Sequence, residues 1–263
     1  MSRQSLKNVM RLIESVEKEL PVEQQFLGDL KRSIELSANK ESRKPSQTYK
    51  PSSMNCPRAS YYQLVGAEPD ETGANYTLIG IGNSGTDAHV RYQTAISDMK
   101  THGIDCEYIN VAEYVKSREL SDLEIVSQNG METKLYNKKY NISFLCDGII
   151  RYKGRYYILE LKTETSYKWQ NRKGVDPGHY NQATTYSLSL GLDDVIFVYI
   201  NRDICDLKAY LFHVDDDMRN IIINYIENCN YYVTIKQVPP KSEAVDKKTC
   251  SYCNYRATCN KEI

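Results

Sequence analysis

The chain has 263 residues, and its 34 Lys and Arg residues balance 34 Asp and Glu residues, so the formal net charge is zero. Charged residues make up 26% and hydrophobic residues 41% of the sequence, which is typical of a folded globular protein and excludes disordered and fibrous classes. No window approaches the ~18 consecutive apolar residues of a membrane span, and the first ten residues lack the apolar segment of a secretory signal. We therefore expect a cytoplasmic protein with no membrane partner.

Two amphipathic helices are predicted at the start of the chain. Apolar residues recur there at helical spacing on both sides of Pro21: Val9, Leu12, Ile13, Val16, Phe26, Leu27, Leu30 and Ile34. The following stretch is polar, contains two prolines and has no apolar period, which is typical of a linker. We expect a helical appendage over residues 1–36, a polar linker over 37–53 and the main domain over 54–263.

Strands and helices alternate along the main domain. A glycine-led run, Gly80–Met99, predicts a helix with His89 and Gln93 on one face. Strands are expected around Val111, Ile125 and 134–136, with Asn129-Gly130 as a hairpin turn, and then at 141–150, 155–164, 195–200 and 208–214. Further helices are expected at 177–191 and after Asp215, with Ile221, Ile222, Tyr225, Ile226 and Cys229 facing inward. This density of alternation predicts an α/β fold with one mixed sheet covered by helices.

Two acidic residues and a lysine lie on adjacent strands of a predicted hairpin. If the turn at Lys153-Gly154 has two residues, paired residue numbers sum to 307, and Asp147 lies opposite Glu160. Residues two apart on a strand share a face, so Glu160 and Lys162 project together. Directly opposed residues have Cβ atoms about 5 Å apart, close enough for two carboxylates to bind one divalent cation.

An exposed strand face with a cross-strand ion pair is the alternative explanation for these three residues, because such pairs are common on sheets. The neighbouring residues favour a site. Asp147 lies within an apolar run from Phe144 to Ile150, and Glu160 lies within Tyr157–Leu161. Because an unpaired charge in apolar surroundings is costly, a metal ion is the natural partner of these carboxylates.

Asp147-Gly148 followed by Glu160-Leu161-Lys162 resembles the D...(D/E)-x-K core of the PD-(D/E)XK nucleases. The glycine-led helix with His89, and a later helix with Gln182 and Tyr186 four residues apart, resemble the RecB-like branch of that family. The resemblance covers about residues 52–259. It implies a restriction-endonuclease-like fold, in which helices flank a mixed β-sheet, and a Mg²⁺- or Mn²⁺-dependent deoxyribonuclease.

The resemblance also implies a role for each site residue. The divalent ion would be held by Asp147, Glu160, His89 and the carbonyl oxygen of Leu161. Lys162 would orient the attacking water or stabilise charge on the phosphate, and Gln182, Tyr186 and Arg58 would position the DNA strand. Further backbone contacts are expected from local basic residues: Arg151, Lys153, Arg155, Lys168, Arg172 and Lys173.

The cysteines near the C-terminus follow a metal-binding pattern. Cys250, Cys253 and Cys259 have the spacing C-x2-C-x5-C, and Cys56 is the candidate fourth ligand. Three clustered cysteines and one remote cysteine suit a 4Fe-4S cluster better than a zinc ribbon, which usually has two C-x2-C motifs. Zinc and free thiols remain alternatives. The remaining cysteines are expected to be small buried residues: Cys106, Cys146, Cys205 and Cys229.

The local sequences SSMNCPRASYY and CSYCNYRATC resemble the cluster-binding ends of the CRISPR-associated RecB-like exonucleases and of the AddB nuclease domain. This resemblance implies an exonuclease in recombination, repair or CRISPR and phage DNA processing. The expected substrate is single-stranded DNA with a free end, because Gln182 and Tyr186 share one helical face and Tyr186 would stack on an unpaired base. A non-catalytic DNA-binding subunit of an adaptation or recombination complex, and a zinc-clipped endonuclease, are the alternatives. Two kinds of protein partner are considered: a second copy of this chain, and a CRISPR or recombination protein.

Overall fold

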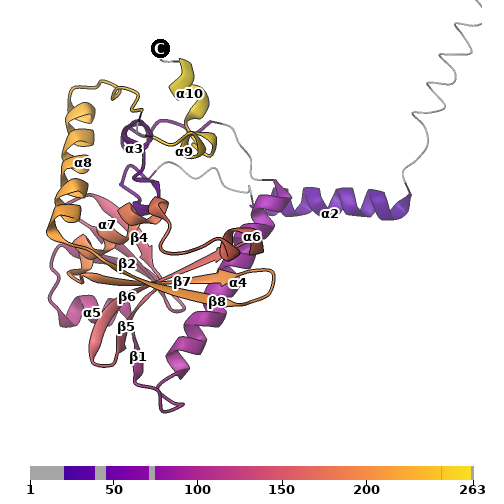
Figure 1. Ribbon diagram of the computed structural model, residues 1–263. Helices are drawn as coiled ribbons and strands as arrows, with labels where there is room; N and C mark the ends of the chain where they lie inside the picture. Colours follow the sequence, from indigo (N-terminus) through magenta and orange to yellow (C-terminus); the bar gives the residue numbers. More distant parts are fainter. Residues whose placement is uncertain (1–20, 39–45, 71–74, 244, 262–263) are drawn as a thin grey trace, which may run out of the picture. The chain divides into compact units, whose positions relative to one another are not determined.

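The structure is a computed structural model, and it describes residues 21–38, 46–70, 75–243 and 245–261 (Figure 1). The chain falls into two compact units, one made of Met1–Ser42 with Gly73–Ile81 and the other of Arg43–Thr72 with Gly82–Ile263. None of the helices in the described ranges is long and apolar enough to cross a membrane.

The smaller unit contains helix α2 (Val22–Ala38) and the beginning of helix α4 (Tyr76–Asp98). The backbone N–H of Tyr76 donates to Glu35 Oε1 at 3.0 Å, and Lys31 Nζ lies 4.7 Å from the centre of the Tyr76 ring. Helix α2 confirms the second predicted N-terminal helix and extends through Ala38. The first predicted helix lies outside the described residues, and the boundaries at residues 36 and 53 stay predictions.

A five-stranded sheet forms the centre of the larger unit, in the order β1 (Cys106–Ile109), β5 (Gly148–Tyr152), β6 (Arg155–Glu164), β7 (Asp194–Asn201) and β8 (Leu207–His213). Strands β6 and β7 are parallel, whereas the other neighbouring pairs are antiparallel. The predicted mixed sheet is therefore confirmed.

Helices cover both faces of this sheet, as Figure 1 shows. On one face, helix α4 packs through Ala88 against Leu159 and Leu161. On the other face, helix α7 (Tyr180–Leu190), preceded by the 3-10 turn η2 (Pro177–His179), packs through Ala183 and Leu190 against the sheet, and helix α8 (Asp216–Thr234) lies beside it. This arrangement confirms the predicted restriction-endonuclease-like class, a mixed sheet flanked by helices.

A second, three-stranded sheet consists of β2 (Leu123–Asn129), β3 (Glu132–Asn137) and β4 (Ile142–Cys146). The predicted Asn129-Gly130 turn connects β2 to β3, and Gly130 has φ 59°, a value that glycine tolerates. The prediction of a single sheet was wrong. So was the continuous strand over 141–150, because the chain leaves one sheet after Cys146 and enters the other at Gly148.

The strand expected around Val111 is instead helix α5 (Val111–Ser117). Asn110 caps it, because its side-chain oxygen accepts hydrogen bonds from the backbone N–H groups of Ala112 and Glu113. The apolar residues of this segment are buried on one helical face rather than in a strand. Local capping therefore outweighs the strand propensity of valine at this point.

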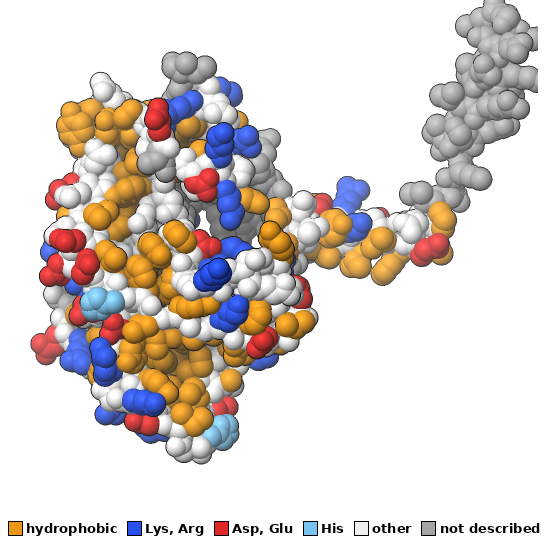
Figure 2. Space-filling view, viewed as in Figure 1, with side chains coloured by type: hydrophobic (Ala, Val, Ile, Leu, Met, Phe, Trp, Pro, Cys, Tyr) orange, Lys and Arg blue, Asp and Glu red, His pale blue; other side chains and the backbone are white. Residues whose placement is uncertain are grey.

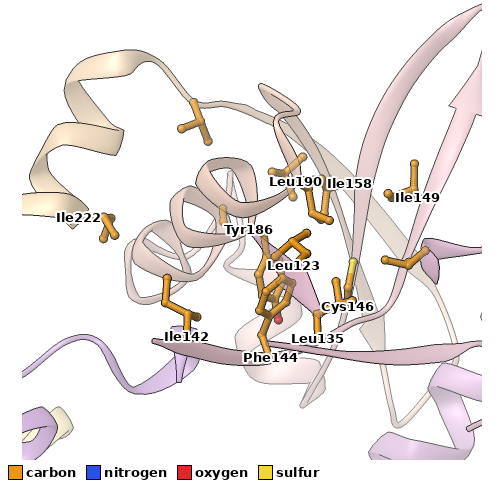
Figure 3. Packing of buried hydrophobic residues seen from close by; sticks show 14 of the residues in the cluster. Leu123, Leu135, Ile142, Phe144, Cys146, Ile149, Ile158, Tyr186, Leu190 and Ile222 are labelled. Atoms are coloured by element: carbon orange, nitrogen blue, oxygen red, sulfur yellow. The ribbon is translucent and has the colours of Figure 1, made fainter. Parts of the chain in front are cut away.

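The main apolar core lies between helix α7 and both sheets (Figure 3). Phe144 from β4 and Tyr186 from α7 stack with ring centres 5.1 Å apart, and Ile149 and Ile158 close the core from the five-stranded sheet. Helix α8 buries Ile222, Ile226 and Cys229 as predicted. Ile221, which was predicted to face inward, is 63% exposed.

Residues from the predicted linker also enter this core. Tyr49 forms an isolated bridge with Ile142, and its hydroxyl donates to the carbonyl of Ile226 at 3.0 Å. A 3-10 turn, η1 (Pro51–Ser53), and helix α3 (Pro57–Leu64) follow. The C-terminal helices α9 (Lys247–Ser251) and α10 (Arg256–Lys261) complete the larger unit.

Candidate active site

Asp147 lies at the point where the chain passes from one sheet to the other. Its backbone carbonyl accepts hydrogen bonds from Gln93 Nε2 at 2.6 Å and from the Tyr108 hydroxyl at 2.7 Å. The next residue, Gly148, packs so closely under Tyr108 that an added Cβ would lie 2.6 Å from the ring. The side chain of Asp147 is directed to the site, where Oδ2 accepts from the Leu161 N–H at 2.7 Å.

The hairpin register predicted for Asp147 and Glu160 is confirmed. Strands β5 and β6 pair Gly148 with Leu159 and Tyr152 with Arg155, so paired numbers sum to 307. At the turn, Lys153 has φ 48° and Gly154 has φ 80°, the left-handed pair that a two-residue hairpin turn requires. This turn sets the register that carries Asp147 to the end of the ladder, next to Glu160.

The buried carboxylate of Glu160 is held by two side chains. Its Oε1 accepts from Lys162 Nζ at 2.6 Å and from Gln182 Nε2 at 2.8 Å. The amide oxygen of Gln182 accepts from Lys162 Nζ at 3.0 Å. The second oxygen of Glu160, Oε2, is buried and has no hydrogen-bond partner in the described chain.

His89 and Glu132 complete the acidic side of the site. His89 Nδ1 lies 3.2 Å from Asp147 Oδ1 and 3.7 Å from Glu132 Oε1. One ligand atom from each of these three residues lies within 4.8 Å of the other two. Glu132 was not predicted, although the register of strands β3 and β4 pairs Thr133 with Cys146. Extending that register by one residue places Glu132 opposite Asp147, so the pairing arithmetic used for the next hairpin could have found it.

The charges at the site shift the proton affinities of its members. Burial, together with the negative charge of Asp147, raises the pKa of Glu160, and the Lys162 ammonium only partly offsets this. Burial alone would lower the pKa of His89, but its hydrogen bond to Asp147 and that carboxylate's charge outweigh burial and raise it. In the absence of a cation, the ionised form of Glu160 beside Asp147 is therefore electrostatically unfavourable.

These residues fit a divalent cation. Carboxylate oxygens and an imidazole nitrogen are ligands that Mg²⁺ and Mn²⁺ accept, and the unpartnered oxygen of Glu160 is available beside Asp147. The N–H of Leu161 already binds Asp147, which holds this part of strand β6 at the site. The ligand role expected for the Leu161 carbonyl stays a prediction.

Two of the side chains predicted to contact DNA are buried and bind other parts of the protein. Tyr186 is only 4% exposed, its ring stacks on Phe144, and its hydroxyl donates to the carbonyl of Leu145 at 2.8 Å. Stacking on a base therefore does not fit Tyr186. Arg58 is buried, and its guanidinium donates to the carbonyls of Pro239 at 3.2 Å and Cys259 at 3.4 Å. These bonds connect α3 to the C-terminal segment, and a strand contact by Arg58 stays an untested prediction.

The four cysteines predicted as cluster ligands converge at the ends of the larger unit. Cys56 precedes helix α3, and the other three lie in and between α9 and α10. Burial raises the pKa of the Cys253 thiol, and the nearby thiols of Cys56, Cys259 and Cys250 raise it further. In the described chain no three of these sulfurs lie within 4.8 Å of one another, whereas a tetrahedral zinc site holds its sulfurs about 3.8 Å apart.

Of the remaining cysteines, Cys106, Cys146 and Cys229 are buried as predicted. Cys205 is exposed, so the expectation that it is a small core residue was wrong. It lies beyond the end of β7, at φ 60°, in the tight turn that leads into β8. Cys205 is exposed because it lies in the turn between β7 and β8 and not within a strand.

The sequence matches no protein-family model and no curated protein. Among solved structures, the crystal structure of SSO0001 is 16% identical, with coverage of 91% of this chain and 98% of that chain and a TM-score of 0.48. LHK-Exo in complex with dAMP is 12% identical over 72% of this chain and 89% of that chain, with a TM-score of 0.36. A crystal structure of the alkaline exonuclease LHK-Exo from Laribacter hongkongensis is 12% identical over 73% of this chain and 90% of that chain, with a TM-score of 0.36. All three likenesses are remote, and the chemistry of the site follows from its own residues.

Proposed function

We propose that this chain is a metal-dependent nuclease that hydrolyses phosphodiester bonds in DNA. The observation that carries the proposal is that Lys162 reaches the buried carboxylates of Asp147 and Glu160, where Glu160 Oε2 has no hydrogen-bond partner in the described chain. Adjacent buried carboxylates are destabilising unless a cation neutralises them. A lysine beside two such acids supplies the positive charge that a phosphate group needs.

The residues proposed to hold the divalent ion are Asp147, Glu160 and His89, with the carbonyl of Leu161 as a further ligand and Glu132 beside them. What a bound Mg²⁺ or Mn²⁺ supplies at such a site is polarisation of a phosphate oxygen and a lower pKa for water. Glu132 and Asp147 both approach Nδ1 of His89 and hold this edge of the imidazole at the site.

Lys162 is proposed to stabilise the negative charge that builds up on the scissile phosphate. Its ammonium is held by Glu160 Oε1 and Gln182 Oε1, so it is oriented before the substrate arrives. Gln182 also donates to Glu160 through Nε2, and that nitrogen is 2.9 Å from the Tyr186 hydroxyl. In this proposal Gln182 and Tyr186 position the reacting side chains rather than contact the strand.

The proposed substrate is single-stranded DNA with a free end, cut in recombination, repair or CRISPR and phage DNA processing. The net charge of zero gives no support to wrapping of a duplex, and acidic and basic side chains are interspersed on the face of the larger unit shown in Figure 2. Binding of an unpaired strand gains free energy from base stacking on aromatic side chains in addition to phosphate contacts.

We further propose that Cys56, Cys250, Cys253 and Cys259 bind a 4Fe-4S cluster with a structural role. Cys253 is close enough to Cys56, Cys250 and Cys259 for their charges to act on its thiol, so the four candidate ligands lie in one region of the fold. The backbone N–H of Tyr255 donates to Cys253 Sγ at 3.4 Å, a contact of the kind that tunes cluster sulfurs.

The function is tested by cleavage of three DNA substrates, a linear single strand, a circular single strand and a blunt duplex, in Mg²⁺, Mn²⁺ or EDTA. We expect the wild type to degrade the linear single strand in either metal and to be inactive in EDTA. Lys162→Ala should reduce cleavage by roughly 10²- to 10³-fold, because one preorganised group that stabilises transition-state charge is removed.

The matched control is Lys116→Ala on helix α5, an exposed lysine outside the proposed site, which should cleave like the wild type. Near-native cleavage by folded Lys162→Ala would contradict the mechanism. Binding of the single strand without cleavage in either metal would favour a non-catalytic subunit. Equal rates of cleavage for the circular and the linear single strand would favour an endonuclease.

A further inference from the structure

A hollow of about 350 Å³ opens in the segment that joins strand β6 to helix α7. This volume falls in the ~300–1,000 Å³ range of small-molecule sites. The segment connects the strand that carries Glu160 and Lys162 to the helix that carries Gln182. The hollow is thus built by the same stretch of chain that holds both halves of the proposed catalytic site.

The floor of the hollow is held in place by Arg172. Its guanidinium donates Nε to Glu164 Oε1 at 2.8 Å and Nη2 to Glu164 Oε2 at 2.7 Å, and it lies 3.9 Å from the centre of the Tyr199 ring. The side chains of both ion-pair partners are almost fully buried. Arg172 was predicted to contact DNA phosphates. Its guanidinium is instead buried and forms an ion pair with Glu164, so it stabilises the fold.

Strand β8 also holds the segment, from the same face of the sheet as Glu164 and Tyr199. Lys208 Nζ donates to the carbonyl of Trp169 at 2.8 Å, and the Tyr210 hydroxyl donates to the carbonyl of Arg172 at 3.0 Å. These bonds fix backbone carbonyls at two points of the segment that includes helix α6 (Ser166–Gln170). The hollow is therefore preformed, which lowers the entropic cost of binding a ligand.

The rim of the hollow carries an aromatic ring and positive charge. Tyr167 is 81% exposed, while its backbone carbonyl is fixed by a 2.7 Å hydrogen bond from Asn171 Nδ2. Lys173 forms no ion pair within the described chain, whereas Lys168 lies 3.0 Å from Asp176. Tyr167 and Lys173 both line the hollow, so it offers an exposed ring and an ammonium without an ion-pair partner in the described chain to a ligand that has a flat apolar face and a negative charge.

The hollow is connected to the proposed catalytic lysine through Tyr199, which pairs with Lys162 in the parallel ladder of β6 and β7. The N–H of Asp176, a residue that lines the hollow, donates to the Tyr199 hydroxyl at 3.0 Å, and the same hydroxyl lies 3.0 Å from His179 Nδ1 at the start of α7. A strand leaving the catalytic site along the start of α7 would therefore reach the hollow.

We propose that this hollow binds an unpaired nucleotide of the DNA strand, with the base against the Tyr167 ring and the phosphate at Lys173. This inference rests on the proposed nuclease function and names the part of the surface that selects single-stranded substrate. Base stacking on an aromatic ring accepts any base, and a paired base in a duplex has no free face to offer. Tyr167 takes the stacking role for which Tyr186 is too deeply buried.

The test measures binding of a fluorescein-labelled (dT)12 strand and of a blunt duplex of equal length by anisotropy, in EDTA so that neither is cut. We expect Tyr167→Ala to bind the single strand about 5- to 150-fold more weakly than the wild type, the range that corresponds to the loss of one stacked base. Tyr167→Phe should retain most of the affinity, because stacking needs the ring and not the hydroxyl. Lys173→Ala should weaken binding and make it less sensitive to salt.

Tyr231→Ala serves as the matched control, because Tyr231 is also a mostly exposed tyrosine but lies on helix α8. A Tyr167→Ala protein with wild-type affinity, or an equal loss for Tyr167→Phe, would overturn the stacking site while leaving the nuclease proposal intact. An equal loss of affinity for the duplex would also overturn it. If the wild type neither binds nor cuts single-stranded DNA, the proposed function itself fails.

Discussion

The side-chain amide of Gln182 holds Glu160 and Lys162 in one arrangement. Its nitrogen donates to the carboxylate and its oxygen accepts from the ammonium, so neither partner can rotate without breaking a hydrogen bond. The Tyr186 hydroxyl, which donates to the Leu145 carbonyl, lies 2.9 Å from the same nitrogen and fixes the orientation of the amide. One helical turn between Gln182 and Tyr186 thus sets the geometry of two residues on the neighbouring strand.

Protonation of the acidic cluster should make the metal-free protein sensitive to pH. The raised pKa values of Glu160 and His89 mean that the folded state keeps protons that the unfolded chain has already released. The unfolding free energy should therefore fall as the pH rises from about the ordinary glutamate value of 4.5 through neutrality. Thermal unfolding in EDTA across this pH range measures the effect.

Glu160→Gln should flatten this pH dependence, because a glutamine at position 160 carries no proton to lose. Addition of Mg²⁺ to the wild type should raise the melting temperature most at high pH, where the acids are ionised. Glu113→Gln, on the exposed side of helix α5, is the control and should keep the wild-type slope. An unchanged slope in Glu160→Gln would show that the site acids do not cause the dependence.

At the scale of elements, two hairpin registers converge on one residue. The ladder between β3 and β4 runs toward Glu132 and Asp147, and the ladder between β5 and β6 runs toward Asp147 and Glu160. The chain can switch sheets at Asp147 because Gly148 has no side chain to collide with Tyr108. The Tyr108 hydroxyl also lies 3.0 Å from the carbonyl of Met131, the residue before Glu132. The same hydroxyl therefore contacts the backbone beside Glu132 and that of Asp147.

Gly148→Ala should disturb this crossing. The new methyl group would lie 2.6 Å from the Tyr108 ring, so the ring must move away from the carbonyls of Asp147 and Met131. We expect the unfolding free energy to fall by about 1–3 kcal/mol, as for other overpacked sites, and DNA cleavage to fall with it. Urea unfolding followed by circular dichroism gives the first quantity.

Gly82→Ala on helix α4 is the matched control, because an added Cβ there meets nothing within 4 Å. Alanine has the better helix propensity, so this variant should be as stable as the wild type or more so. Equal stability of Gly148→Ala and the wild type would mean that the ring of Tyr108 can shift without cost, and the crossing would then not depend on glycine.

At the scale of the molecule, segments distant in sequence are tied together at the cysteine cluster. Arg58 from helix α3 donates to the carbonyls of Pro239 and Cys259, and Asp70 accepts from the N–H groups of Ala257 and Thr258 at the start of α10. Tyr62 and Tyr255 pack with ring centres 5.5 Å apart beside these contacts. The two ends therefore remain adjacent through side-chain bonds, and a metal cluster would reinforce a contact that already exists.

Anaerobically purified wild-type protein should be brown and contain about four irons per chain, because four thiolates of this spacing suit a 4Fe-4S cluster. Cys253→Ser should bleach the protein and lower its melting temperature, since metal binding by these ligands is coupled to folding. The Arg58 and Asp70 contacts should keep the variant folded. Iron analysis, visible absorbance and thermal unfolding measure the three effects.

Cys205→Ser is the control for this experiment, because Cys205 is exposed and lies in the turn between β7 and β8. It should retain iron and colour. A colourless wild type with one bound zinc would establish the zinc alternative, and an iron content unchanged by Cys253→Ser would exclude this cysteine as a ligand.

Local patterns were sufficient for the α/β class, the Lys153-Gly154 hairpin and the shared face of Glu160 and Lys162, because turn chemistry and the two-residue period of a strand depend on adjacent residues alone. Tertiary packing decided the rest. The break at Asp147 exists because two sheets meet there, Glu132 joins the site through a separate hairpin, and Tyr186 is buried because helix α7 packs against Phe144. Exposure and contacts between distant segments depend on the whole chain. The sequence was therefore enough to propose the reacting side chains, and only the fold determined which neighbours hold them.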